Sequence, residues 1–154
     1  MPIGYVSQLR RIVRAEPDSD VLFYGSTNER RNKVLDQMKG LKVESVFGVY
    51  GLKRDALIGR AKLVLNLHYY EAKLFEIVRV SYLMANGIPV VTEESPDIPE
   101  DLRPGLAIAP YEKLAETCKD LVNDLARRVE LGRKAFECFS KRDEGEILRK
   151  ALAA

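Results

Sequence analysis

Polar and aromatic side chains follow a buried apolar run at His68, Tyr69 and Glu71, where a β-strand should end. An imidazole, a phenol and a carboxylate can each form hydrogen bonds with a ligand. A lone histidine is more often a hydrogen-bonded wall residue than a catalyst. Tyr69 either packs as a lid or offers a face for stacking on a base. Glu71 either meets a ligand or caps the helix that follows.

A second candidate cluster follows an earlier apolar run. Gly25 and Ser26 stand between a predicted strand and a predicted helix, and Asn28 has the residue type of an N-cap. Glycine lets the backbone approach a ligand, and free N–H groups at a helix start favour a phosphate. Arg30 could supply a cation. Neither GxGxxG nor a P-loop is present, so an ordinary strand-to-helix turn is the alternative.

Three charged side chains could complete such a site. Lys73 opens a predicted helix whose first amides, ahead of Phe75, could hold a diphosphate. Arg79 stands between two valines and needs an anion if it is half buried. Glu76, three residues earlier, is the favoured partner, and a ligand phosphate is the alternative. Glu93 ends a later strand and either accepts hydrogen bonds from sugar hydroxyls or belongs to a solvated acidic loop.

Apolar runs and helical periodicity alternate along the chain and indicate the elements that position these residues. Predicted strands cover 20–24, 43–49, 62–67, 89–92 and 106–109. Predicted helices cover 29–39, 53–60, 74–86, 111–139 with a break near 130–132, and 143–151. In the helix at 74–86, an apolar stripe of Leu74, Phe75, Val78, Leu83 and Met84 is predicted to face the core.

This order predicts an α/β fold: a single Rossmann-like domain whose parallel sheet of about five strands has the order 3-2-1-4-5. Helices should cover both faces, with a helical C-terminal tail. The switch point then lies between the first and fourth strands, where the turns at 25–28, 68–73 and 92–95 should converge. Residues 1–19 read as a leading segment or linker, and residues 20–154 as the domain.

Composition narrows the function classes. The chain has 154 residues and 46% hydrophobic content, which suits one domain. A formal charge of +2 with interspersed signs argues against nucleic acid. One histidine and two widely spaced cysteines argue against a metal cluster and a disulfide framework. With no transmembrane-length run and no signal peptide, we expect a cytoplasmic protein or one at the inner face of a membrane.

The stretch Val78–Val91 (VRVSYLMANGIPVV) resembles the R-V-F-E-A-L-A-C-G-x-P-V-V helix-turn-strand motif of group 1 glycosyltransferases. Those enzymes have the GT-B fold of two Rossmann-like halves, and this motif belongs to the C-terminal half, which holds the nucleotide-sugar donor. The segment 20–30 looks like the first strand and phosphate-side loop of that half. The likeness covers about residues 20–140, and Arg79 matches an arginine found in one branch of the family.

The chain departs from the family pattern at two positions. Many relatives carry two glutamates eight residues apart on this helix, and the second commonly binds ribose hydroxyls. Leu74 and Tyr82 stand at those positions here, so Tyr82 would have to contact the donor in another way. The family's acceptor site and usual catalytic base lie on the N-terminal half, which we do not expect among these residues, so the catalytic residues stay unassigned.

The resemblance therefore implies the donor-binding half of a GT-B glycosyltransferase, inactive without an acceptor-binding half or partner subunit. It implies a nucleoside-diphosphate sugar as donor substrate, with no metal and no further cofactor. A non-catalytic Rossmann-like interaction module with a vestigial nucleotide pocket is the main alternative. A flavodoxin-like or receiver-like regulatory domain is a weaker one, because the acidic cluster expected at the end of the first strand is replaced by Tyr24, Gly25 and Ser26.

Overall fold

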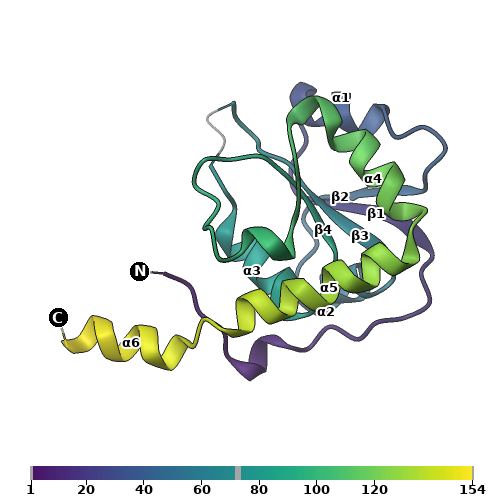
Figure 1. The fold of residues 1–154 in the computed structure, drawn as a ribbon. Helices are drawn as coiled ribbons and strands as arrows, with labels where there is room; N and C mark the ends of the chain where they lie inside the picture. The colour runs from purple at the N-terminus through teal and green to yellow at the C-terminus, as the bar shows by residue number, and fades with distance from the viewer. Residues whose placement is uncertain (1, 72–73, 154) are drawn as a thin grey trace.

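Five parallel strands form the centre of the molecule in this computed structural model, which describes residues 2–71 and 74–153 (Figure 1). The strands are β1 (Ser19–Tyr24), β2 (Val43–Val46), β3 (Ala61–Asn66), β4 (Val90–Glu93) and β5 (Ala107–Ala109). They lie in the order β2-β1-β3-β4-β5, and all neighbours run parallel. The predicted α/β class is thus confirmed.

The predicted strand order 3-2-1-4-5 is wrong. β1 lies between β2 and β3, with Val21 opposite Leu63, and β3 continues to β4, with Val64 opposite Val90. Both orders obey the right-handed crossover rule, so the pattern of apolar runs could not separate them. The switch point is therefore between β1 and β3, and the turns after these two strands lie side by side there.

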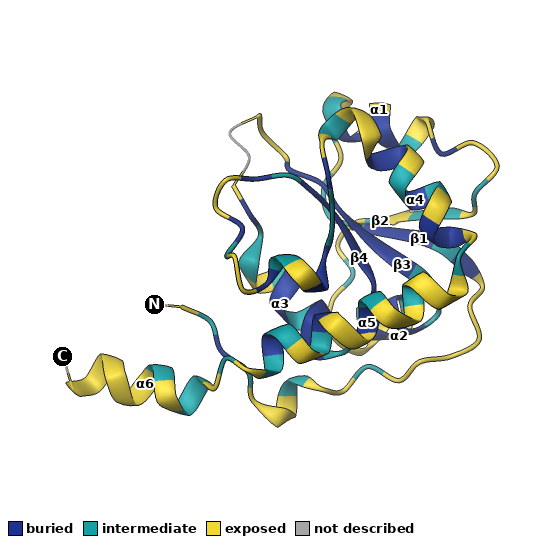
Figure 2. Ribbon diagram, viewed as in Figure 1, coloured by how far each residue is buried: buried dark blue, intermediate teal, exposed yellow. Residues whose placement is uncertain are grey.

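Two helical layers sandwich the sheet (Figure 2). One face of the sheet packs against α2 (Gly51–Gly59), α3 (Ile77–Ala85) and α5 (Leu125–Ser140), and the other against α1 (Glu29–Asp36) and α4 (Leu114–Val122). Side chains alternate between the faces, as a pleated strand requires. In β1, Leu22 joins the first core while Val21 and Phe23 join the second, and all three are fully buried.

Several predicted boundaries shift, and three of them are the clearest. The helix predicted from Leu74 begins at Ile77, and β2 ends at Val46 rather than at 49. The long helical tail breaks at 123–124 rather than near 130–132, because Asp124 accepts a hydrogen bond from the amide of Arg127 (3.0 Å) and caps α5. Helical periodicity continues across the start of α3 and across the break before α5, so it could not locate either boundary.

The predicted apolar stripe of the helix at 74–86 is only partly buried. Phe75, Leu83 and Met84 lie in the core, but Leu74 and Val78 are each 71% exposed. The amide of Phe75 donates instead to the carboxylate of Asp97, at 3.1 and 3.2 Å from its two oxygens. This contact holds residues 74–76 outside the helix and leaves the side chain of Leu74 exposed.

The leading segment is bound along its length, and the chain ends in a projecting helix. Asn86 accepts hydrogen bonds from the amides of Arg11 and Ile12 (both 2.9 Å) and donates to the carbonyl of Leu9 (2.9 Å).

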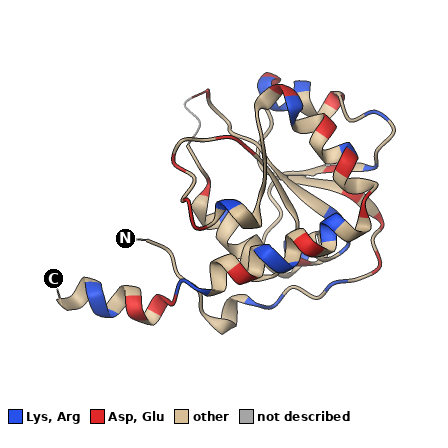
Figure 3. Ribbon diagram, in the orientation of Figure 1, with Lys and Arg blue, Asp and Glu red and all other residues tan. Residues whose placement is uncertain are grey.

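Helix α6 (Glu144–Ala153) has no buried residue and extends away from the domain (Figure 1). Charged residues of both signs are spread over the outer surfaces (Figure 3). In the described chain no helix has the length and apolarity to cross a bilayer.

Candidate functional site

A hollow of about 680 Å³ opens at the carboxyl edge of the sheet, where α3 begins, and we call it the α3 hollow. Open parallel sheets bind ligands at this edge, and α3 approaches it beside the switch point. Its polar lining comes from the end of β1, the leading segment, α2 and α3: Tyr24, Arg11, Arg54, Glu76, Arg79 and Tyr82. Three arginines stand against Glu76 in this lining, and Asp55 beside it also pairs with Arg11 (3.5 Å) and Arg54 (2.9 Å), so one positive charge remains in excess.

The first turn of α3 faces this hollow without a side-chain cap. Glu76 occupies the N-cap position, but its carboxylate makes no capping hydrogen bond. The first amides of a helix lack partners within the helix and carry partial positive charge. The α3 start therefore adds to the attraction that the arginines exert on an anion.

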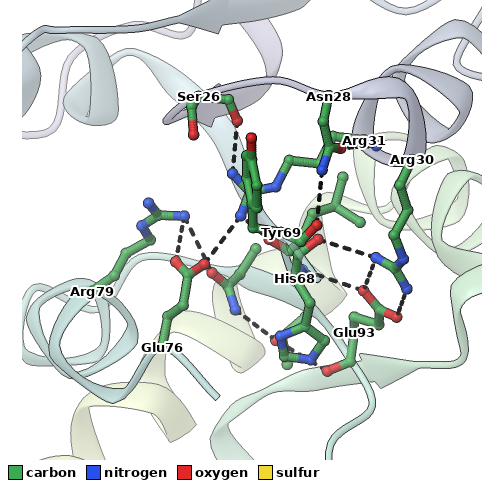
Figure 4. A network of polar contacts seen from close by, with 12 residues as sticks. Ser26, Asn28, Arg30, Arg31, His68, Tyr69, Glu76, Arg79 and Glu93 are labelled. Carbon is green, nitrogen blue, oxygen red and sulfur yellow. Dashed lines mark hydrogen bonds and ion pairs between the residues drawn. The ribbon is translucent and has the colours of Figure 1, made fainter. Parts of the chain in front are cut away.

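Glu76 instead bridges two arginines (Figure 4). Its Oε2 lies 2.6 Å from Nη1 of Arg79, and its Oε1 lies 3.1 Å from Nη2 of Arg31. Arg31 is 2% exposed and also donates to the carbonyl of Ser26 (2.7 Å), and burial lowers its pKa. One carboxylate thus serves two guanidinium groups. The predicted Glu76–Arg79 ion pair exists, and the cluster keeps one positive charge in excess.

Tyr24 contributes a protonated hydroxyl beside these charges. The guanidinium of Arg79 lies 4.9 Å from its ring centroid. Burial raises the pKa of Tyr24 to about 12, although the positive charges of Arg79 and Arg54 oppose the shift. The phenol is therefore neutral near pH 7 and can donate a hydrogen bond.

Tyr82, at the position of the family's second glutamate, is part of a polar network at the rim. Its hydroxyl donates to Oδ2 of Asp55 (2.9 Å) and accepts from Nε of Arg11 (3.0 Å). Arg54 pairs with the same carboxylate (2.9 Å). Asp55 is 6% exposed. Many relatives have a glutamate at the position of Tyr82. Here a carboxylate from α2, that of Asp55, lies next to this position instead.

A second hollow, of about 820 Å³, lies beside α1 at the same edge and takes the other predicted residues. We call it the α1 hollow, and its lining includes Asn28, Arg30, Tyr69, Tyr70, Glu71 and Tyr111. Arg30 and Glu93 form a double ion pair whose Nη1–Oε2 distance is 2.8 Å, and Glu93 is fully buried. The Arg30 cation is thus already neutralised, and Glu93 does not reach a sugar from the surface.

The sequence-predicted residues are therefore split. Phe75, Arg79 and Tyr82 line the α3 hollow, and Gly25 lies against Arg79. Asn28, Arg30, Tyr69 and Glu71 line the α1 hollow. Ser26, His68 and Glu93 line neither of them. Lys73 falls outside the described residues.

Several predicted site residues have structural partners (Figure 4). Asn28 caps α1 by accepting from the amide of Arg31 (2.9 Å) and donates to the carbonyl of Tyr69 (2.8 Å). The amide of Gly25 donates to the carbonyl of Val46 (2.9 Å). Of the amides at 25–28 and 74–76 that were expected to hold a diphosphate, those of Gly25 and Phe75 are bonded within the fold. His68 is 2% exposed, and its ring nitrogens have no hydrogen-bond partner in the described structure.

Sequence reasoning missed Arg11, Tyr24 and Arg54, which line the α3 hollow, and Asp55, which pairs with both of these arginines. Tyr24 ends a strand at the switch point, and that position was a usable signal. Arg11 and Arg54 come from a segment that reads as a linker and from a short amphipathic helix, so only the folded structure brings them together. Among the described residues, no three His, Cys, Asp or Glu side chains are grouped closely enough to hold a metal ion.

The sequence model of the family described as "Glycosyl transferase-like" matches residues 7–143, so the chain belongs to that family. Two uncharacterized proteins of Acanthamoeba polyphaga mimivirus are similar. One is 36% identical over 95 residues, 58% of this chain and 11% of the relative. The other is 32% identical over 92 residues, 56% of this chain and 13% of the relative. The chain spans about a tenth of the length of these curated relatives.

Solved structures agree on the fold. The C-terminal domain of a group 1 glycosyl transferase, LpcC from Francisella tularensis, matches with a TM-score of 0.63 at 9% identity, over 90% of this chain and 97% of that one. TarM matches with a TM-score of 0.62 at 22% identity, over 87% and 28% of the two chains. Sucrose-phosphate synthase from Thermosynechococcus elongatus has a TM-score of 0.63 at 16% identity, over 99% and 52%. The chain thus has the fold of the C-terminal half of group 1 glycosyltransferases.

Proposed function

We propose that this domain binds a nucleoside-diphosphate sugar as the donor half of a GT-B glycosyltransferase, and that the diphosphate occupies the α3 hollow. The observation that carries the proposal is the meeting of Arg11, Arg54 and Arg79 with the uncapped start of α3 in one hollow. Membership of the family and the position at the carboxyl edge of the sheet support it. The acceptor and the catalytic base would come from another half or subunit.

In this proposal the charge of the leaving diphosphate is balanced by Arg79, Tyr24 and the first amides of α3. Arg79 would turn from Glu76 toward a phosphate, since a guanidinium matches phosphate oxygens as well as a carboxylate. The α3 amides would add partial positive charge where negative charge develops as the glycosidic bond breaks. Tyr24 would donate its hydroxyl proton to a phosphate oxygen without losing it, because its pKa is about 12. Sugar transfer itself would need the acceptor-binding half.

Isothermal titration of the chain with a panel of nucleoside diphosphates tests this proposal. Arg79→Gln should weaken binding by roughly tenfold to a hundredfold, because a charge-assisted hydrogen bond contributes about 1.5–3 kcal/mol. Arg133→Gln is the matched control, since Arg133 pairs with Glu130 and Glu137 on the exposed side of α5. If no nucleoside diphosphate binds even at millimolar concentration, or if both variants bind as the unaltered chain does, the donor role fails.

A non-catalytic interaction module is the second candidate. It is favoured because groups that could bind a nucleotide are already paired within the protein. Glu76 neutralises Arg79, and the carboxylate of Asp97 accepts a hydrogen bond from the amide of Phe75. Leu74 and Tyr82 stand where many relatives have glutamates. Replacing Glu76 distinguishes the two functions. Glu76→Gln should free Arg79 and strengthen nucleotide binding if the site is functional, whereas a vestigial pocket stays empty in this variant as well.

A further inference from the structure

A groove of about 420 Å³ lies at the amino edge of the sheet, opposite the α3 hollow. It runs between the leading segment, the turn from α3 to β4 and α5, and we call it the basic groove. Its charged lining residues are all cations: Arg10, Arg14, Lys62, Arg128 and Arg133. The overall formal charge is only +2, so this edge is much more basic than the molecule as a whole.

Two of these cations are neutralised locally. Lys62 pairs with Asp20 (2.7 Å), and Arg133 pairs with two glutamates one turn away on α5. Arg10, Arg14 and Arg128 form no ion pair with any described carboxylate. Three positive charges without an ion pair among the described residues therefore face one groove, and they come from two segments that are far apart in the sequence.

The three arginines are held in place by neutral groups. Arg10 stacks on the ring of Phe136, with its guanidinium carbon 4.5 Å from the ring centroid. Arg128 donates to the carbonyl of Leu121 (2.7 Å), and Arg14 donates to that of Ile58 (3.3 Å). Desolvation of this guanidinium, together with the nearby positive charge of Arg128, lowers the pKa of Arg14. An anion in the groove would relieve the repulsion between them.

Aliphatic side chains stand exposed beside these cations. Leu125 and Val129 line the groove one helical turn apart and are 66% and 64% exposed, and Val13 on the leading segment is 82% exposed. Cations mixed with exposed aliphatic side chains suit a lipid headgroup region, where the charges meet phosphates and the apolar side chains enter the acyl boundary. A nucleic acid backbone would use the cations alone.

We propose that the basic groove and its aliphatic rim dock this domain on an anionic lipid bilayer. The arginines would bind lipid phosphates, and Leu125, Val129 and Val13 would insert at the interface. Asn86 holds the backbone that carries Arg10, Val13 and Arg14 through its bonds to the leading segment. Because the α3 hollow lies at the other edge of the sheet, it would stay open to water while the domain is docked.

Co-sedimentation of the full chain with vesicles tests this inference. The vesicles contain phosphatidylcholine alone or with roughly a third of phosphatidylglycerol, a composition that sets the surface charge. The variant Arg10→Gln/Arg14→Gln/Arg128→Gln should lose roughly a hundredfold in partitioning to anionic vesicles, because each basic side chain near such a surface contributes on the order of 1 kcal/mol. The control Lys39→Gln/Lys53→Gln/Lys150→Gln removes the same charge from exposed sites elsewhere and should keep its binding.

A second variant separates insertion from charge alone. Leu125→Gln/Val129→Gln keeps every cation and should weaken vesicle binding by roughly tenfold through lost apolar burial. Circular dichroism and thermal unfolding verify that each variant is folded. The inference is overturned if anionic vesicles do not bind the chain, or if the two triple variants lose binding equally. It is also overturned if the three arginines bind inorganic phosphate or duplex DNA while vesicles stay unbound.

Discussion

Gly25 forms the turn after β1, and its backbone packs directly against the arginines of the candidate site. Its φ is +142°, in the region that favours glycine, and a Cβ there would lie 3.2 Å from Nη2 of Arg79 and 3.7 Å from Nη1 of Arg31. The two guanidinium groups that share Glu76 therefore pack against a bare backbone. A larger residue would both strain the turn after β1 and push on Arg79.

We predict that Gly25→Ala destabilises the fold by about 2 kcal/mol, since it combines an unfavourable φ with this contact. Gly40→Ala is the matched control, because Gly40 also has a positive φ (+88°) but nothing lies within 4 Å of its added Cβ. Urea unfolding of both variants, repeated in an Arg79→Ala background, separates strain from contact. The extra cost at Gly25 should shrink in that background, and an equal cost at the two glycines would contradict the role of Arg79.

The types of individual residues in the sequence indicated a binding site, but they did not show which residues form hydrogen bonds and ion pairs with one another. An acid at the end of a strand was recognisable at Glu93, yet its counterion, Arg30, stands 63 positions earlier. The amide of His68 also donates to this carboxylate (3.2 Å). A buried carboxylate needs such partners, so Glu93 organises the switch point from inside. Which acid is buried and which faces solvent depends on packing that no local pattern records.

At the scale of elements, the sequence predicted most strands and helices, but it did not predict which strands lie next to each other in the sheet. Continuous apolar runs such as 62–67 indicated strands buried on both faces, and β3 confirms it. Strand order depends on which pairs bury the most surface, and two orders suited the same runs. The start of α3 was missed for a related reason. Leu74 continues the apolar pattern but lies outside the helix, because Asp97 from a distant loop binds the amide of Phe75.

The leading segment offers an element-scale prediction. Its backbone is fixed by Asn86, which accepts from two amides and donates to one carbonyl of the segment. Asn86→Ala should release this segment and destabilise the fold by about 2 kcal/mol, because three hydrogen bonds are lost at about 0.5–1.5 kcal/mol each, partly offset by water. Trypsin should then cleave faster at the arginines between positions 10 and 14.

Asn123→Ala is the control for this measurement. Asn123 also ends a helix and donates to a carbonyl within its own helix, but it is exposed and does not contact the leading segment. Its replacement should leave the rate of cleavage in the leading segment unchanged. Mass spectrometry of the early tryptic fragments identifies the cleaved bonds. Equal protection of residues 10–14 in the Asn86 variant would show that the segment is held by its side chains instead.

For the whole molecule, ion pairs should set the response to acid. Among the described residues, six carboxylates have pKa values below their usual range, those of Asp20, Asp97, Asp101, Glu116, Glu130 and Glu137. For Asp101 the main cause is its hydrogen bonds with Arg142, at 2.6 Å for both contacts. For Asp97, burial opposes the shift, but hydrogen bonds from Ser95 and the amide of Phe75 outweigh it.

A folded-state pKa below the unfolded value means that the deprotonated form stabilises the fold. This stabilisation is fully present above the unfolded pKa of about 4 and is lost as the pH falls through the lower folded value. We therefore predict that the free energy of unfolding is steady near neutral pH and falls steeply below about pH 4. Urea unfolding at a series of pH values measures this slope.

Asp101→Asn tests the assignment of that slope to particular ion pairs. It should lower the free energy of unfolding at pH 7 by about 0.5 kcal/mol, because the pair with Arg142 is more than half exposed on the carboxylate side. It should also make the acid loss shallower, since one fewer carboxylate takes up a proton on unfolding. Asp36→Asn, at an exposed site without an ion pair in the described chain, should leave the slope unchanged. An identical pH profile for the two variants would mean that the corner between α5 and the loop at 101 is held by packing rather than by charge.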